Sequence, residues 1–205
     1  MNLTLLLSIV VLPLDLSKLA PMPGDEDASS YYRLERDERG PFIRSDYRPG
    51  MKAQKLALEL PANARGGRHV LRWRWWARVL PTGGDECADG KGDSAASVYV
   101  GWRRGLRWYG LKYAWSSVGK KGAICDSKRN PFLVGDAIHL ESGPPLDEWV
   151  DERVDLEADF RAHFEDGDPK AEVPELIGVA LLSDGDATGT EASADFGGFE
   201  LEVSR

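Results

Sequence analysis

Two acidic, glycine-rich loops carry the residues of this chain that are best suited to chemistry. The first loop, PTGGDECADGKGDS, holds Asp85, Glu86, Asp89 and Asp93, and the second, SDGDATGT, holds Asp184 and Asp186. Carboxylate oxygens are ligands that calcium prefers, and glycine permits the tight backbone that such loops need. The loops therefore predict a site for a cation or a polar ligand, but they identify no reaction.

Each loop also has a plainer interpretation. The spacing of the first does not match an EF-hand, so a solvated surface loop is an alternative for Asp85, Glu86 and Asp89. In the second loop, an Asx-turn that ends the preceding apolar run would account for the two aspartates without a ligand. Asp93 differs, because it leads directly into an apolar run, where a carboxylate is usually hydrogen-bonded to something specific.

Aromatic and basic residues could complete such a site. Candidate platforms for stacking on a sugar ring are the pairs Trp115 with Tyr113 and Trp102 with Trp108. Arg129, in the segment KRNPF, could anchor an anionic ligand or form a structural ion pair with the acidic loops. Most tryptophans of a β-sandwich are core residues, so of seven we expect four or five to be buried. Our site hypothesis is that Asp93, Asp184, Asp186, Arg129 and Trp115 converge at one end of the domain.

Evidence for catalysis is weak. The three histidines, His69, His139 and His163, lack the HxxxH and HxH spacings of metal sites, and no Gly-x-Ser-x-Gly motif is present. A glycosidase needs two carboxylates roughly 5–9.5 Å apart, and Asp93 with Asp184 is the pair we nominate. The sequence favours a protein that is not an enzyme, with no catalytic residue assigned and with calcium as the one cofactor to consider.

Composition excludes one broad class of partner. The formal net charge is −8, and the sequence pI is about 5.0. A nucleic-acid binder needs a basic face that displaces phosphate counterions, so we expect no nucleic-acid partner. We expect a monomer. We also expect no transmembrane segment, because no apolar run is long enough to span a bilayer.

The two cysteines and the N-terminus bear on location. Cys87 and Cys125 both lie in glycine-containing loops, which favours one disulfide in an exported protein over two unrelated thiols. The apolar run Leu3 to Leu14 has the length of a signal peptide, although no Lys or Arg precedes it and Ala20 is followed by proline. We therefore expect a signal segment and linker in residues 1–30 and one domain in 31–205, in the periplasm or secreted.

Period-2 alternation dominates the rest of the chain and indicates strands. Strand-like runs begin near residues 32, 42, 52, 70, 98, 111, 137, 176 and 199, separated by Gly/Pro turns. One stretch has helical spacing, with Leu156, Phe160 and Phe164 on one stripe and Asp155 as a candidate cap. The pattern predicts an all-β fold, an antiparallel jelly-roll-like β-sandwich with one short helix near 155–165.

Several motifs in fixed order resemble a known family. They are LRWRWWARVLPTGGDECADGKGDSAASVYV, LKYAWSS, KRNPF, WVDERVDLEADFRAHF and IGVALLSDGDATGTEASADFGGF. Over residues 70 to 203 the chain resembles the bacterial family known as domain of unknown function 3047. The resemblance implies export, and the order of elements is similar to jelly-roll carbohydrate-binding modules. The chain has Asp195-Phe196 where the family commonly has an aromatic pair, so the resemblance supports no aromatic platform there.

Together these observations predict an exported β-sandwich that binds a ligand, in particular carbohydrate at the cell envelope, without catalysis. One alternative is a polysaccharide hydrolase with paired carboxylates. The other is a structural or interaction protein without a small ligand.

Overall fold

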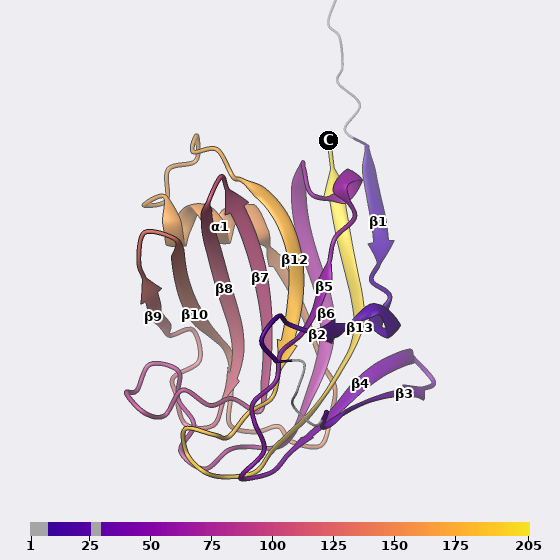
Figure 1. Ribbon diagram of the computed structural model, residues 1–205. Helices are drawn as coiled ribbons and strands as arrows, with labels where there is room; N and C mark the ends of the chain where they lie inside the picture. The colour runs from indigo at the N-terminus through magenta and orange to yellow at the C-terminus, as the bar shows by residue number, and fades with distance from the viewer. Residues whose placement is uncertain (1–7, 26–29) are drawn as a thin grey trace, which may run out of the picture.

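The structure is a computed structural model that describes residues 8–25 and 30–205, with the backbone alone for residues 127 and 128. Its strands form two sheets that pack face to face, together with a short α-helix (Figure 1). The chain is mostly strand, so the predicted jelly-roll-like β-sandwich is confirmed.

One layer, sheet A, has the strand order β11, β6, β13, β4 and β3, and β1 pairs with the end of β13. Its strands are β1 (Ile9–Pro13), β3 (Tyr32–Asp37), β4 (Gly40–Tyr47), β6 (Arg68–Val79), β11 (Val150–Asp155) and β13 (Ala192–Ser204). The neighbouring strands are antiparallel throughout.

The other layer, sheet B, has the order β2, β5, β12, β7, β8, β10 and β9. Its strands are β2 (Ala20–Pro21), β5 (Leu56–Glu59), β7 (Ala96–Arg104), β8 (Arg107–Ser116), β9 (Ile124–Arg129), β10 (Leu133–Ser142) and β12 (Glu175–Leu182). β8 and β10 run parallel, which corrects the expectation of a purely antiparallel fold. The reason is β9, which the sequence had assigned to a loop: the chain forms β9 at the edge of the sheet and then returns as β10 between β9 and β8.

Alternating side chains from both sheets form the core. The four most deeply buried tryptophans are Trp73, Trp75, Trp102 and Trp115, each no more than 2% exposed. The rings of Trp75 from sheet A and Trp115 from sheet B lie 5.7 Å apart, so they join the two layers. The expectation of four or five buried tryptophans is confirmed. Two short 3-10 turns, Leu16–Lys18 and Ala62–Ala64, complete the domain.

The α-helix α1 (Leu156–Phe164) confirms the helix predicted near 155–165. Asp155 caps it by accepting a hydrogen bond from the Ala158 backbone N–H at 3.2 Å. The Phe160 ring packs 5.2 Å from Trp102 and 5.1 Å from Tyr109. Because these two residues belong to the core side of sheet B, α1 packs on that side and not on the outer face of sheet B.

Cys87 and Cys125 form the predicted disulfide, with Cα atoms 5.0 Å apart and a sequence separation of 38. The bond ties the first acidic loop, which precedes β7, to β9. The loop is therefore held against the edge of sheet B.

Part of the stretch predicted as a signal segment forms β1, while residues 1–7 lie outside the described residues. β1 pairs with residues 200–204 of β13, and β2 pairs with β5. A chain cleaved after Ala20 would lack β1, so cleavage there and this strand exclude each other. In the part of the chain that the structure describes, no helix is long and apolar enough to cross a bilayer.

Candidate functional site

The outer face of sheet B is defined by the alternation of β7 and β8. On β7, Val100 and Trp102 belong to the core, so Gly101 between them faces outward. On β8, Gly110 lies in the same way between two core residues. Side chains at every second position of these strands therefore point away from the core and from α1, which Figure 1 shows behind β7 and β8.

A two-residue turn at Gly105 and Leu106 sets which residues of β7 and β8 lie opposite each other. Gly105 has a φ of +61°, which suits the first position of a type II′ hairpin turn. The resulting pairs on the outer face are Arg103 with Trp108, Gly101 with Gly110, and Tyr99 with Lys112.

A row of glycines crosses four adjacent strands at one register. Gly178 of β12 pairs with Gly101 of β7, Gly101 with Gly110 of β8, and Gly110 with Gly135 of β10. A Cβ atom added at Gly101 or Gly110 would meet no atom within 4 Å, so the space above these two residues is open. We call Gly101, Gly110 and Gly135 the glycine strip. It is a band of backbone without side chains that runs across the strands.

An aromatic residue lies on each side of the glycine strip. Trp108 is 40% exposed, and the Arg103 guanidinium lies 5.4 Å from the centre of its ring. Tyr99, on the other side, is half-buried, and its ring has the ammonium groups of Lys55 and Lys112 at 5.6 and 5.4 Å from its centre. Both rings combine an apolar surface with nearby hydrogen-bond donors.

Charged groups of both acidic loops lie near the Lys112 ammonium, which is next to the Tyr99 ring. The Lys112 ammonium is buried and lies 2.5 Å from Glu86, which also accepts a hydrogen bond from the Ser94 hydroxyl at 2.6 Å. Asp184 is only 6% exposed and accepts from the Ser94 backbone N–H at 3.4 Å. Burial raises the pKa of Asp184 to about 7, with Lys112 opposing this shift and the neighbouring carboxylates adding to it.

Asp93, Asp184 and Asp186, which we call the acidic cluster, place one carboxylate oxygen each within 4.8 Å of one another. Asp93 is fully buried and accepts backbone hydrogen bonds from Ala187 at 3.1 Å and Thr188 at 2.6 Å. These bonds explain why Asp93 leads into a strand: it holds the second acidic loop in place. Three converging carboxylates are also suitable calcium ligands, and calcium binding here stays a prediction.

The structure brings together three of the five residues of the site hypothesis. Trp115 does not join the acidic cluster, because it points inward from β8, is fully buried and donates its indole N–H to the Gly143 carbonyl at 2.8 Å. Arg129 lies on β9, where its guanidinium forms ion pairs with Asp126 and Asp136. Trp102, the other candidate platform, is also buried in the core.

The three residues proposed as metal ligands in the first loop do not share one site. Glu86 forms the ion pair with Lys112, Asp89 is exposed, and Asp85 accepts the Cys87 backbone N–H at 2.9 Å. Among the described residues, the groups placed to hold a metal ion are the acidic cluster and the set Cys87, Cys125 and His139. Loop spacing alone could not show this, because the disulfide and the ion pair direct each side chain differently.

Sequence reasoning missed Tyr99, Lys112 and the glycine strip. Their signal was present in GWRRGLRWYGLKY, where a two-residue turn at Gly105 places the two glycines opposite each other. Extending that register by two residues pairs Tyr99 with Lys112 on the face away from the core.

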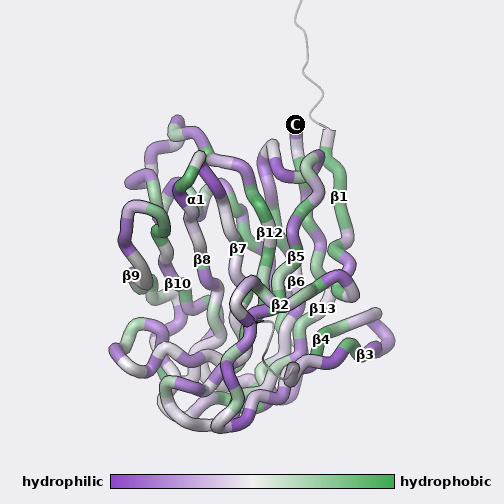
Figure 2. The backbone as a smooth tube through the Cα atoms, viewed as in Figure 1, coloured by the Kyte–Doolittle hydropathy of each residue, from purple (hydrophilic) through white to green (hydrophobic). Residues whose placement is uncertain are grey.

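Sheet A carries two shallow hollows, and in each of them an arginine of the lining already has an acidic partner. The first is lined by Trp76 and Arg78, and the Arg78 guanidinium lies 2.8 Å from Asp195. The second is lined by Arg74, which lies 2.7 Å from Asp37. Figure 2 shows hydrophilic and hydrophobic residues interspersed along the strands of both sheets. Sheet B is therefore the stronger candidate.

Comparisons with known proteins agree with a family assignment. A family model described as "Protein of unknown function (DUF3047)" matches residues 21–200. No curated protein matches the sequence.

Solved structures align over most of the chain at low similarity. The xyloglucanase domain of NopAA, a type three effector from Sinorhizobium fredii, is 11% identical, covers 98% of this chain and 99% of its own, and has a TM-score of 0.40. Endoglucanase 3 of family GH12 from Trichoderma harzianum is 8% identical, with coverages of 100% and 99% and a TM-score of 0.40. The carbohydrate recognition domain of Emp47p is 11% identical, with coverages of 93% and 98% and a TM-score of 0.35.

Proposed function

This chain belongs to the family described as "Protein of unknown function (DUF3047)", and we propose that it binds an extended carbohydrate across the outer face of sheet B. The observation that carries the proposal is the glycine strip, which is open above Gly101 and Gly110 and flanked by Trp108 and Tyr99.

The chemistry of this face suits sugar rings. A pyranose has apolar faces that pack on aromatic rings and hydroxyl groups that need hydrogen-bond partners. Trp108 offers an exposed ring, and Arg103 and Lys55 offer donors beside the two aromatic residues. Because neighbouring strands lie about 4.8 Å apart, the open backbone above Gly101 of β7 and Gly110 of β8 spans about 5 Å, and no side chain at these two positions would hold a sugar ring away from the sheet.

We place this activity outside the cytoplasm, at the cell envelope. The support is the disulfide, since such bonds persist in oxidising compartments. N-terminal sequencing of the exported protein tests the location. A mature chain that begins before Ile9 would keep β1, whereas cleavage after Ala20 would remove it.

The test is binding to a panel of soluble neutral polysaccharides by affinity electrophoresis and titration calorimetry. Trp108→Ala should weaken binding by about tenfold or more, because an aromatic face at a binding site contributes on the order of 1–2 kcal/mol. Gly110→Val should abolish binding while the protein stays folded, because the added side chain enters open space and valine suits a strand. The matched control is Leu34→Ala, an exposed apolar residue of sheet A.

Two results would count against this proposal. One is the absence of binding to every polysaccharide of the panel, which would favour a structural or interaction protein. The other is binding that Gly110→Val leaves unchanged, which would place the carbohydrate on another face.

A second candidate function, polysaccharide hydrolysis, is favoured by one observation. Asp184 has a pKa raised to about 7, while the nearby Glu86 is in an ion pair with Lys112, so the two carboxyl groups have different environments. Glu86 replaces Asp93 in the nominated pair, because both Asp93 oxygens accept backbone hydrogen bonds. Release of reducing ends from a bound polysaccharide, lost in Asp184→Asn, would support hydrolysis. Binding without release would exclude it.

A further inference from the structure

His139 is a buried histidine that the proposed carbohydrate site does not use. Its side chain is fully buried on β10, and neither ring nitrogen has a hydrogen-bond partner. A buried polar group without a partner costs free energy, so an imidazole in this position calls for an explanation.

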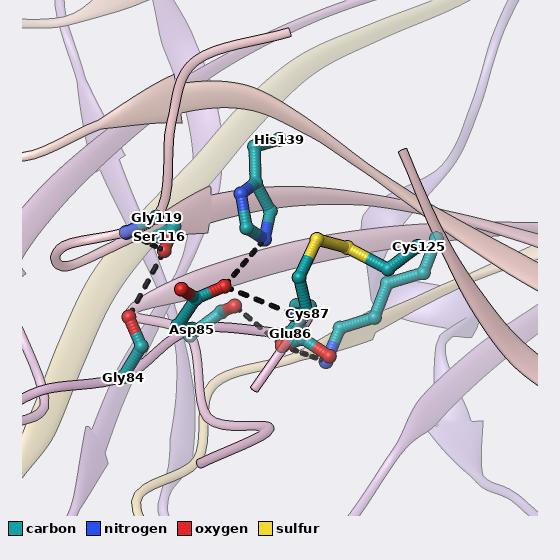
Figure 3. The surroundings of a disulfide bond; sticks show 10 residues. Gly84, Asp85, Glu86, Cys87, Ser116, Gly119, Cys125 and His139 are labelled. Carbon is teal, nitrogen blue, oxygen red and sulfur yellow. Dashed lines mark hydrogen bonds and ion pairs between the residues drawn. A yellow bond between two sulfur atoms is a disulfide. The ribbon is translucent and has the colours of Figure 1, made fainter. Parts of the chain in front are cut away.

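The imidazole is directed at the disulfide and at Asp85. A ring nitrogen of His139 and the two sulfur atoms of Cys87 and Cys125 all lie within 4.8 Å of one another. Nε2 lies 3.6 Å from an Asp85 carboxylate oxygen, and Figure 3 shows the imidazole next to both Asp85 and the disulfide. Three side chains of the types that bind zinc, His139, Cys87 and Cys125, thus lie together on the outer face of sheet B, and the Asp85 carboxylate lies beside the imidazole.

Gly119 fixes the direction of this ring. A Cβ atom at Gly119 would lie 2.5 Å from Nδ1 of His139, so any larger residue there would displace the imidazole. Contact with Gly119 occupies the Nδ1 edge of the ring and leaves Nε2 to face Asp85 and the disulfide. The ring is therefore held with one nitrogen available to a ligand on that side.

We propose that, when the disulfide is reduced, Cys87, Cys125, His139 and Asp85 bind one zinc ion. The site would hold the first acidic loop against β9 and β10, as the disulfide does in the oxidised protein. This inference goes beyond carbohydrate binding and does not depend on it.

The chemistry balances with a thiol reductant. Two reductant thiols give two electrons and two protons to the disulfide, which becomes two cysteine thiols while the reductant becomes its own disulfide. Zinc then displaces the protons of both thiols to solvent and accepts electron pairs from the two thiolates, from Nε2 and from one Asp85 oxygen. His139 keeps its remaining proton on Nδ1.

The observed spacing fits tetrahedral zinc. With bonds of about 2.0–2.1 Å to nitrogen and oxygen, two such ligands lie about 3.3 Å apart. The His139 and Asp85 atoms are already 3.6 Å apart. Two thiolates on one zinc lie about 3.7 Å apart, so the sulfur atoms need only separate once their bond is broken. Asp85 is 24% exposed, which gives the ion a route from solvent.

The test uses zinc and cobalt(II) alone as probes on the full chain, reduced with a phosphine or a thiol and then desalted without oxygen. We expect one zinc per chain by elemental analysis in the reduced protein and none in the oxidised protein. Cobalt should show a thiolate charge-transfer band and the visible bands of a tetrahedral ion. His139→Gln should weaken zinc binding at least about tenfold, whereas His69→Gln, at a buried histidine of β6, should not.

The double variant Cys87→Ser, Cys125→Ser is the second test protein. Like the reduced wild-type protein it has no disulfide, but it also has no thiols. It should bind no zinc, and zinc should raise the melting temperature of the reduced wild type but not of this variant. The proposal is overturned if the reduced wild-type protein keeps no zinc, if the double variant binds zinc equally well, or if His139→Gln binds as tightly as His69→Gln.

Discussion

Replacing Asp184 with asparagine tests the electrostatics of the acidic cluster most directly. The change removes a buried carboxyl whose pKa is raised to about 7 from the ordinary 3.8, chiefly by burial. Asparagine has nearly the same shape, and its side-chain oxygen can still accept the Ser94 backbone N–H. Any difference between Asp184→Asn and the wild-type protein in how stability changes with pH should therefore come from the loss of this titratable carboxyl group.

The sign follows from which state holds the proton. Between pH 3.8 and 7 the folded protein keeps a proton on Asp184 that the unfolded chain has released. The free energy of unfolding therefore falls as the pH rises through this window, and the stability present at low pH is lost above pH 7. At about 1.4 kcal/mol for each pKa unit, the whole window corresponds to about 4 kcal/mol as an upper value, and the part above pH 5.5 to about 2 kcal/mol.

The assay is urea unfolding followed by tryptophan fluorescence at pH 5.5 and pH 8, with a chelator present so that no cation occupies the cluster. We expect the wild-type protein to lose about 2 kcal/mol more than Asp184→Asn between these two pH values. Asp89→Asn, a change at an exposed carboxylate, should follow the wild-type protein. Equal pH dependence in Asp184→Asn and the wild type would refute the reasoning and mean that Asp184 is ionised in the folded state.

Three further predictions follow from the same structure. Replacing both Cys87 and Cys125 with serine should lower the free energy of unfolding by about 4 kcal/mol, the value of the chain-entropy model for a sequence separation of 38. Denaturant unfolding measures this loss, and a loss well below about 1 kcal/mol would contradict the prediction. Burial raises the pKa of Glu152 to about 7, so Glu152→Gln should increase the free energy of unfolding at pH 8 by about 1 kcal/mol, a value reduced to allow for the partial exposure of Glu152, and should leave it unchanged at pH 4. An increase that is the same at both pH values would exclude titration of Glu152 as the cause. If the acidic cluster binds calcium, chelation should lower the melting temperature and added calcium should restore it, whereas a protein indifferent to both would leave the cluster a structural element.

The sequence by itself determined the fold class, because each element carried its own local signal. Period-2 alternation marked most strands, and three apolar residues at helical spacing behind Asp155 marked α1. Cys87 and Cys125 suggested a disulfide through their loop context alone. Local patterns of this kind predict strands correctly, because the alternation that marks a strand also determines which of its sides is buried.

Tertiary structure decided which of the candidate residues lie together. Trp115 and Trp108 are both aromatic residues of β8, but they have opposite parity, so one lies in the core and the other on the outer face. Arg129 falls on β9, which hydrophobic pattern did not reveal because this edge strand contributes little to the core.

The glycine strip and the surroundings of His139 depend on pairing between distant segments. Gly135 meets Gly110 only because β10 runs parallel to β8, a crossover that period-2 patterns do not specify. His139 meets Asp85 and the disulfide only because the first acidic loop folds back over sheet B. Strand alternation fixes the face on which a residue lies, but the order and register of the strands decide its neighbours, and that order is set by packing of the whole domain.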